Sequence, residues 1–336
     1  MKRVSAVLGS LSALLCVGAL GFAPGAGAQL IVVGQTAPPG TPYTCSEERS
    51  YVEFQSSTAA GNSYVFPTAG RVTSWSVMGG PSPASTFGVK VLRPVIGNSY
   101  KIVGGEVSFS LGAGVLNTYP LSIDVEAGDI LGTQFYGGDS APCLFETGSA
   151  GDRVRWDERI GLTNSTVNFD PEHTYSGARL NASATLLPPP TISSFGPTKG
   201  TIKGEKVVVR GTNFSDVRSV KFGGRYAKKF TVDSEEQITA FAPTAFKLET
   251  KLPVSVTTGA GIATGAGTYS YVGCKVPTLA NKKLKPAKRA LKKAGCKLGK
   301  VTLRYGATAR TGKVLSQHPS AGTIRLPGTK VKLTLY

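Results

Sequence analysis

The basic side chains near the C-terminal end are the groups whose type and spacing most clearly imply a chemistry. Residues 273–336 hold sixteen Lys or Arg residues and no Asp or Glu. Residues 29–187 hold nine basic and fourteen acidic residues, and residues 188–272 hold eleven and six. The formal net charge of +18 is therefore concentrated in one segment. Such a segment attracts polyanions through Coulomb forces that salt screens.

An amphipathic helix is predicted over residues 284–295, LKPAKRALKKAG. Pro286 suits the first helical position, since its missing N–H costs nothing there. Gly295 can adopt the positive φ that ends a helix. Apolar side chains recur at the spacing of one helix face, and they are Leu284, Ala287, Leu291 and Ala294.

Basic residues occupy the other face of this helix and the segment just before it. Like charges four residues apart repel by roughly 0.2–0.5 kcal/mol, and no acidic residue offsets them. A surface that only keeps a protein soluble usually mixes both signs of charge. We therefore favour a polyanion-binding surface, with simple solubility as the alternative. The residues of this surface are Lys282, Lys283, Lys285, Lys288, Arg289, Lys292 and Lys293.

A catalytic centre is the competing class of function. His173, in DPEHTYS, could serve a Ser–His–Asp arrangement, but the chain has no G-x-S-x-G or H-E-x-x-H motif. We interpret His173 as a histidine of a turn. The dipeptides Glu47–Glu48 and Asp157–Glu158 supply no glycosidase pair, because adjacent residues of a strand point to opposite faces. With no phosphate-binding, dinucleotide-binding or calcium-binding motif either, we expect no enzyme activity, no cofactor and no metal.

The first 28 residues predict export. The basic MKR is followed by an apolar run and then by AGA at 26–28, a small-residue cleavage site. Cleavage after Ala28 would leave Gln29 as the first residue of the mature protein. A membrane anchor is the alternative, but Gly and Ser dilute the apolar run, and no later stretch approaches about 18 consecutive apolar residues. We expect a secreted protein with no membrane span after cleavage.

Cleavage after Ala28 would remove Cys16 and leave four cysteines. Export would place these four in an oxidising compartment. Four cysteines allow three connectivities. Two lie in the first expected domain and two in the last, so pairing within domains predicts Cys45 with Cys143 and Cys274 with Cys296. A zinc site is the alternative, but neither pair has C-x-x-C spacing.

Residues 29–187 predict a β-sandwich or jelly roll, because short alternating segments are separated by turn residues about every 8–12 positions. The candidate strands are 50–54, 63–66, 72–78, 87–95, 99–105, 119–125, 129–136 and 153–158. The stretch from AGRVTSWSV to DVEAGDILG resembles an uncharacterised sandwich domain of secreted actinobacterial proteins, which implies no activity. Aromatic side chains here could bind a glycan or a protein, although core packing is their usual role: Trp75, Tyr119, Tyr136 and Trp156.

A run of three prolines at 188–190 marks the next boundary. The strand rhythm of residues 188–272 suits an immunoglobulin-like sandwich. The motifs I-x-x-F-x-P-x-x-G (192–200), V-x-G-T-N-F (209–214), V-K-F-G-G (220–224) and the closing Y-S-Y are similar to those of the IPT/TIG family. The resemblance implies a spacer or an adhesive unit.

Residues 273–336 resemble the PASTA family, which implies a small α+β domain. The matching motifs are V-P-x-L (276–279), G-K-V (312–314), S-Q-x-P-x-A-G-T (316–323) and P-G-T-K-V-K-L-T-L (327–335). PASTA domains are associated with peptidoglycan binding, but the family has no fixed ligand-contact motif to transfer. Many of its members are also less cationic than this segment.

These observations predict a mainly β protein that is secreted and associated with the cell wall. Its basic PASTA domain would bind peptidoglycan or an anionic wall polymer, and its first domain would be a binding or adhesion module for a glycan or a protein. Specific nucleic-acid binding is not expected, because Tyr305 and Tyr336 are the only aromatic residues in the last segment. The alternative is a secreted carbohydrate-active enzyme or lectin with its activity in residues 29–187.

Overall fold

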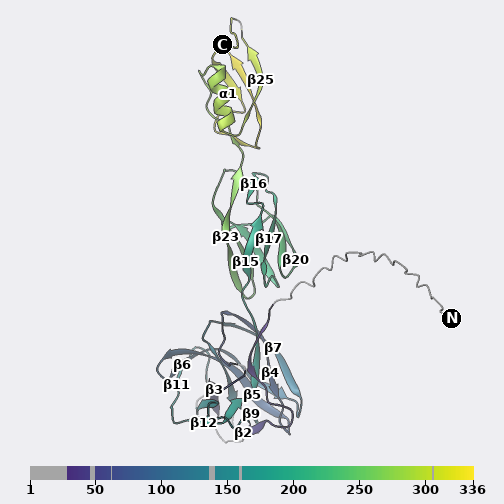
Figure 1. Ribbon diagram of the computed structural model, residues 1–336, viewed down its shortest axis with the longest axis vertical. Coiled ribbons are helices and arrows are strands. Elements are labelled where there is room, and N and C mark those ends of the chain that lie inside the picture. Colours follow the sequence, from purple (N-terminus) through teal and green to yellow (C-terminus); the bar gives the residue numbers. More distant parts are fainter. Residues whose placement is uncertain (1–28, 46–49, 62, 136–140, 159–160, 305) are drawn as a thin grey trace, which may run out of the picture.

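The computed structural model describes residues 29–45, 50–61, 63–135, 141–158, 161–304 and 306–336 (Figure 1). The predicted signal peptide (1–28), Glu47, Glu48, Tyr136 and Tyr305 lie outside the described residues. The described chain is mainly β, as predicted, and in these residues no helix is long and apolar enough to cross a membrane.

We refer to residues 29–187 as the front domain, to 188–272 as the middle domain and to 273–336 as the basic domain. Figure 1 shows them one after another along the long axis, with the C-terminus at the end far from the front domain.

Three sheets build the front domain. A seven-stranded sheet runs β11-β6-β5-β8-β3-β10-β12, a four-stranded sheet runs β1-β14-β4-β7, and a three-stranded sheet runs β13-β9-β2. Their bounds are β1 (Ile31–Gln35), β2 (Tyr43–Cys45), β3 (Tyr51–Ser57), β4 (Gly70–Met78), β5 (Ala84–Ile96), β6 (Ser99–Leu111), β7 (Leu116–Val125), β8 (Ile130–Phe135), β9 (Ala141–Glu146), β10 (Arg153–Asp157), β11 (Thr166–Asn168), β12 (Thr174–Ser176), β13 (Ala178–Leu180) and β14 (Ala182–Leu187).

The core of the front domain lies between the two larger sheets. Trp75 of β4 is fully buried, and its ring centroid lies 6.0 Å from that of Phe87 on β5. Tyr119 of β7 stacks on the same indole at 5.7 Å. Trp75 and Tyr119 therefore pack within the sandwich, which is the role expected for most aromatic residues of this domain.

The prediction of a strand at 63–66 was wrong. Val65 makes only an isolated bridge with Ile130, and the backbone on either side bonds to Gly34 and to residues 128–131. The alternating pattern has another cause, since Tyr64 and Phe66 are buried whereas Val65 is exposed. The Tyr64 hydroxyl donates a hydrogen bond to the Leu180 carbonyl, so this segment caps the core without joining a ladder.

The middle domain is an immunoglobulin-like sandwich of two sheets, β15-β17-β21-β20 and β16-β23-β22-β18-β19. Phe214, Phe222 and Tyr269 are fully buried between them. The bounds are β15 (Thr191–Gly196), β16 (Lys199–Thr201), β17 (Lys206–Thr212), β18 (Val217–Phe222), β19 (Arg225–Tyr226), β20 (Lys229–Ser234), β21 (Gln237–Phe241), β22 (Leu252–Thr258) and β23 (Gly261–Val272).

Asn213 joins the front and middle domains. Its side-chain amide donates to the Pro189 carbonyl at 3.1 Å, and its side-chain oxygen accepts from the Gln29 backbone N–H at 3.3 Å. Asn213 has a φ of 58°, a left-handed conformation that Asn tolerates better than most residues. The Asn213 side chain thus holds both Gln29 and the proline linker against the middle domain.

The basic domain packs one helix against small sheets. Ala287 and Leu291 are buried in the same core as Val331 and Leu333, so the predicted apolar face is the face that packs. The sheets are β24-β27 and β25-β28-β26. The bounds are β24 (Cys274–Lys275), α1 (Leu284–Lys293), β25 (Lys297–Leu303), β26 (Val314–His318), β27 (Ile324–Arg325) and β28 (Lys330–Leu335).

Local chemistry explains both ends of α1, but the predicted position of Pro286 in the helix was wrong. The helix begins at Leu284, so Pro286 is its third residue and not its first. Proline is tolerated there because the first-turn N–H groups have no intrahelical partner. At the other end Gly295 has a φ of +72°. The Cys296 N–H bonds to the Leu291 carbonyl and the Gly295 N–H to that of Lys292, which is a Schellman motif.

Both predicted disulfides are confirmed. Cys45 and Cys143 lie with their Cα atoms 5.8 Å apart, and Cys274 and Cys296 at 4.9 Å. The second bond ties the end of α1 to β24, which begins at Cys274. In a domain this small the hydrophobic core alone is marginal, so a covalent cross-link contributes a large share of the stability.

Replacing Cys274→Ser and Cys296→Ser together should destabilise the basic domain. The bond closes a loop with a sequence separation of 22 residues, and the chain-entropy model assigns about 3 kcal/mol to a loop of this size. For a domain of this length that loss lowers the melting temperature by more than about 10 °C. Differential scanning calorimetry of residues 29–336 should show one transition moving down while the others stay in place. An unchanged set of transitions would contradict the expectation.

Candidate functional site

Two sites of opposite charge emerge from the described residues. The first is the predicted cationic surface, whose seven residues are all exposed. Two of them precede α1 and five lie on it. Because residues 273–336 contain no Asp or Glu, none of the seven has an acidic side-chain partner within its own domain. The repulsion between Lys288 and Lys292, one turn apart, is therefore uncompensated within the domain.

Exposed lysines on β25 and β28 add to this charge, and they were not among the residues predicted for the surface. Lys297 of β25 lies opposite Lys330 of β28 in the parallel register, and Lys332 follows on the same strand. All three are exposed. The signal was present in the alternation K-V-K-L-T-L, where the apolar positions Val331, Leu333 and Leu335 face the core and the others face outward.

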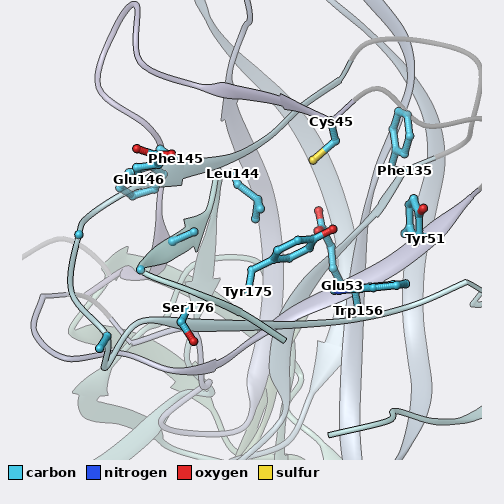
Figure 2. A pocket seen from close by; sticks show the side chains of 14 residues that line it. Cys45, Tyr51, Glu53, Phe135, Leu144, Phe145, Glu146, Trp156, Tyr175 and Ser176 are labelled. Atoms are coloured by element: carbon cyan, nitrogen blue, oxygen red, sulfur yellow. The ribbon is translucent and has the colours of Figure 1, made fainter. Parts of the chain in front are cut away.

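The second site is a pocket of about 610 Å³ in the front domain, at one end of the seven-stranded sheet (Figure 2). Strands β3, β8, β10 and β12 form one wall, and β2 and β9 form the other. The lining residues are Cys45, Tyr51, Glu53, Phe135, Leu144, Phe145, Glu146, Gly148, Ala150, Trp156, Tyr175, Ser176, Gly177 and Ala178.

Strand register assembles the first wall. Glu53 of β3 lies opposite Thr133 of β8 on one side and opposite Trp156 of β10 on the other. Tyr51, two residues before Glu53, lies opposite Phe135. Residues two apart on a strand share a face, and directly opposed residues across strands share it too. Five side chains from three separate strands therefore meet on one face.

The Cys45–Cys143 disulfide braces the second wall. It joins β2 to β9, which pair as neighbours in the three-stranded sheet. Cys45 itself lines the pocket, and Leu144 and Phe145 follow Cys143 on β9. The cross-link thus holds the two strands of this wall together.

Aromatic rings make up much of the first wall. The Tyr51 ring stands at 89° to that of Trp156 with centroids 5.1 Å apart. Tyr175 lies 6.0 Å from Trp156 at 26°, and it is 42% exposed. Trp156 is thus the aromatic candidate from the sequence that reaches a pocket. Trp75 is buried in the core, Tyr119 is half-buried against it, and Tyr136 lies outside the described residues.

His173 lies beside Trp156, in the turn that was predicted for it. Its backbone N–H bonds to the Asp170 carbonyl at 3.1 Å. The imidazole stacks on Trp156 at 4.2 Å and 5°, and its Nδ1 atom is buried without a hydrogen-bond partner. His173 therefore supports the indole, and it does not line the pocket.

Among the described acidic residues, Glu53 has the most strongly shifted pKa. Its side chain is 3% exposed, and the Thr133 hydroxyl donates to its Oε1 atom at 2.9 Å. Burial raises the pKa of Glu53 to about 7, although the bond from Thr133 acts in the opposite direction. The sequence carried one signal of this site, because Glu53 and Gln55 share the alternating positions of a strand whose apolar residues are buried.

Neither site has the ligands of a metal centre. In the part of the chain that the structure describes, no group of three or more His, Cys, Asp or Glu side chains could hold a metal ion. Asp157 and Glu158, which the sequence analysis weighed as a carboxylate pair, do not line the pocket.

Comparison with known proteins identifies two of the three domains. Residues 275–336 match the model of the PASTA domain, and residues 190–271 match that of the IPT/TIG domain. Both resemblances inferred from the motifs are confirmed. No curated protein sequence matches the chain.

Two solved structures share limited similarity with the chain. One is a putative phosphatase from Bacteroides thetaiotaomicron, at 24% identity over 28% of this chain and 21% of that one, with a TM-score of 0.22. The other is SGBP-B from a complex xyloglucan utilization locus in Bacteroides uniformis, at 20% identity over 41% and 48%, with a TM-score of 0.23. The chain thus spans about a fifth and about half of these proteins. TM-scores this low support no inference about function.

Burial of Glu53 predicts a pH-dependent stability that Glu53→Gln should remove. Between about pH 4.5 and 7 the folded protein keeps this carboxyl protonated while the unfolded chain ionises it. Folding then binds a proton, so stability falls as pH rises through this window and levels off above it. A shift of this size corresponds to about 3 kcal/mol.

Denaturant unfolding at pH 5 and pH 8 measures the effect. The Glu53→Gln variant should gain stability relative to the original protein at pH 8 and show a shallower pH dependence. Glu146→Gln, an exposed carboxyl on the same pocket, is the matched control and should leave the dependence unchanged. Equal pH slopes for the Glu53→Gln variant and the original protein would contradict the assignment.

Proposed function

We propose that this is a secreted, non-enzymatic protein of the bacterial envelope, held on the cell wall by its PASTA domain. The observation that carries the proposal is the exposed cationic surface of α1 in a domain without a single Asp or Glu. PASTA and IPT/TIG domains are modules of binding and adhesion, and the two disulfides fit an extracellular protein.

The charge suits peptidoglycan carboxylates and the anionic polymers of the wall. Lysine is a compact point charge on a flexible stem, so binding tolerates variation in the spacing of the anions. Near an anionic surface each basic residue contributes about 1 kcal/mol, and the effect fades within a Debye length of about 8 Å at physiological salt. Several such residues together retain the protein on the wall, and salt weakens that retention.

The middle domain serves as a spacer in this proposal. Figure 1 shows it between the front domain and the basic domain. The Asn213 contacts hold the proline linker in place, which favours a defined separation over a loose tether. A rigid spacer would keep the front pocket away from the polymer that the basic domain binds.

We propose that the front pocket binds a ligand and does not catalyse a reaction. Glycoside hydrolysis needs two carboxyls on either side of the scissile bond. The pocket has a buried carboxyl in Glu53, but Glu146 is exposed and Figure 2 shows its side chain away from Glu53. His173 stacks on Trp156 and is not among the described lining residues. These features support binding over acid–base catalysis.

Retention on purified walls tests the basic surface. The variant with Lys288→Gln, Arg289→Gln, Lys292→Gln and Lys293→Gln should bind at least tenfold more weakly, because four contributions of about 1 kcal/mol before screening are lost. Co-sedimentation of the mature protein with walls, with and without their anionic polymers and over a range of NaCl, measures this.

A matched control removes the same number of charges from the middle domain, at four exposed lysines: Lys199, Lys203, Lys206 and Lys247. That variant should stay bound. Two results would count against electrostatic binding by the basic surface. One is retention that does not change with NaCl concentration, and the other is an equal loss of retention in both quadruple variants.

An activity screen tests the non-enzymatic assignment. We expect the mature protein to release no product from chromogenic glycosides, esters and phosphate esters. A turnover that Glu53→Gln or His173→Ala abolishes would instead establish the front domain as an enzyme.

A further inference from the structure

The front pocket combines aromatic rings with negative charge. Two carboxyl groups, Glu53 and Glu146, line it, and no Lys, Arg or His is among its described lining residues. Its volume of about 610 Å³ falls in the range of pockets that hold small organic ligands. Among these described residues an anionic ligand would meet only like charge, so the lining favours a cation.

The arrangement of the rings suits a cation of organic character. Tyr51 and Trp156 stand nearly perpendicular and form a corner, and Tyr175 extends the wall beside them. A cation within about 6 Å of a ring centroid is attracted by the negative face of the ring, most strongly for Trp. The methyl or methylene groups next to the charge would pack on the same rings, which a bare metal ion could not do.

Glu53 supplies the counter-charge at the base of the pocket. Glu53 and Tyr175 both line the pocket, as Figure 2 shows. A carboxylate with 3% exposure is poorly solvated, which is why burial raises its pKa to about 7. A bound cation would restore the interaction that solvent no longer provides, whereas a neutral ligand would leave the charge without a partner.

We propose that this pocket binds an organic ammonium group, with Tyr51, Trp156 and Tyr175 around the cation and Glu53 as its counter-ion. The ligand class covers a quaternary ammonium, as in a choline headgroup, and a primary alkylammonium, as at the end of a lysyl side chain. The inference does not depend on wall binding, since the basic domain contributes no residue to the pocket.

Tryptophan fluorescence of the mature protein provides the assay. The chain has two Trp residues, and Trp75 is buried in the core and does not line the pocket. Trp75→Phe therefore leaves Trp156 as the single reporter. This protein is titrated with choline and with butylamine, each against a neutral analogue of similar shape: 3,3-dimethylbutan-1-ol for choline and butan-1-ol for butylamine. Calorimetry of the original protein checks each affinity without relying on fluorescence.

We expect at least one ammonium probe to bind ten times or more tightly than its neutral analogue. A preference for choline identifies a quaternary ammonium site, and a preference for butylamine a primary amine site. Glu53→Gln should weaken the preferred probe at least tenfold. Tyr175→Leu should do the same, and because Tyr175 is 42% exposed this variant keeps the test valid if Glu53→Gln fails to fold.

Tyr226→Leu is the control, since Tyr226 is an exposed tyrosine of the middle domain and its loss should leave binding unchanged. The proposal is overturned if the neutral analogues bind as well as the ammonium probes, if no probe binds, or if a folded Glu53→Gln variant binds like the original. Wall retention of the Glu53→Gln variant is measured in parallel and should be normal. Failure of the pocket assay thus stays distinct from failure of wall binding.

Discussion

The pairing of β3 with β8 on one side and β10 on the other is the constraint on which the front pocket depends. It brings Glu53 between Thr133 and Trp156 and sets Tyr51 beside Phe135. A shift of one residue would turn all of these side chains to the opposite face of the sheet. The burial and the raised pKa of Glu53 follow from this register, because the same pairing that collects the rings also removes the carboxyl from solvent.

Local interactions maintain the cationic surface of the basic domain. Ala287 and Leu291 hold one face of α1 in the core, and the Schellman motif at Gly295 ends the helix beside Cys296. The disulfide from Cys296 to Cys274 then fixes that end to β24. The apolar contacts, the cap and the cross-link together offset the repulsion among lysines that have no Asp or Glu in their domain.

The two sites divide the charge of the molecule between its ends. All the Lys and Arg side chains of the basic domain are positive, and the domain has no Asp or Glu. The described residues that line the front pocket include two carboxyl groups and no Lys, Arg or His. The middle domain lies between them (Figure 1). In our two proposals the basic domain holds an anionic surface while a cationic ligand occupies the front pocket, and the two binding events need not compete.

The sequence alone determined the β-rich fold, the identity of the middle and basic domains, both disulfides and the exposed basic residues. These follow from composition, spacing and short motifs, which are properties of neighbouring residues. Only the tertiary structure decided that 63–66 is no strand, that Trp156 lines a pocket while Trp75 does not, and that Glu53 and Tyr175 line the same pocket. Those outcomes depend on which strands pair and in which register, and pairing between distant strands is set by the packing of the whole domain.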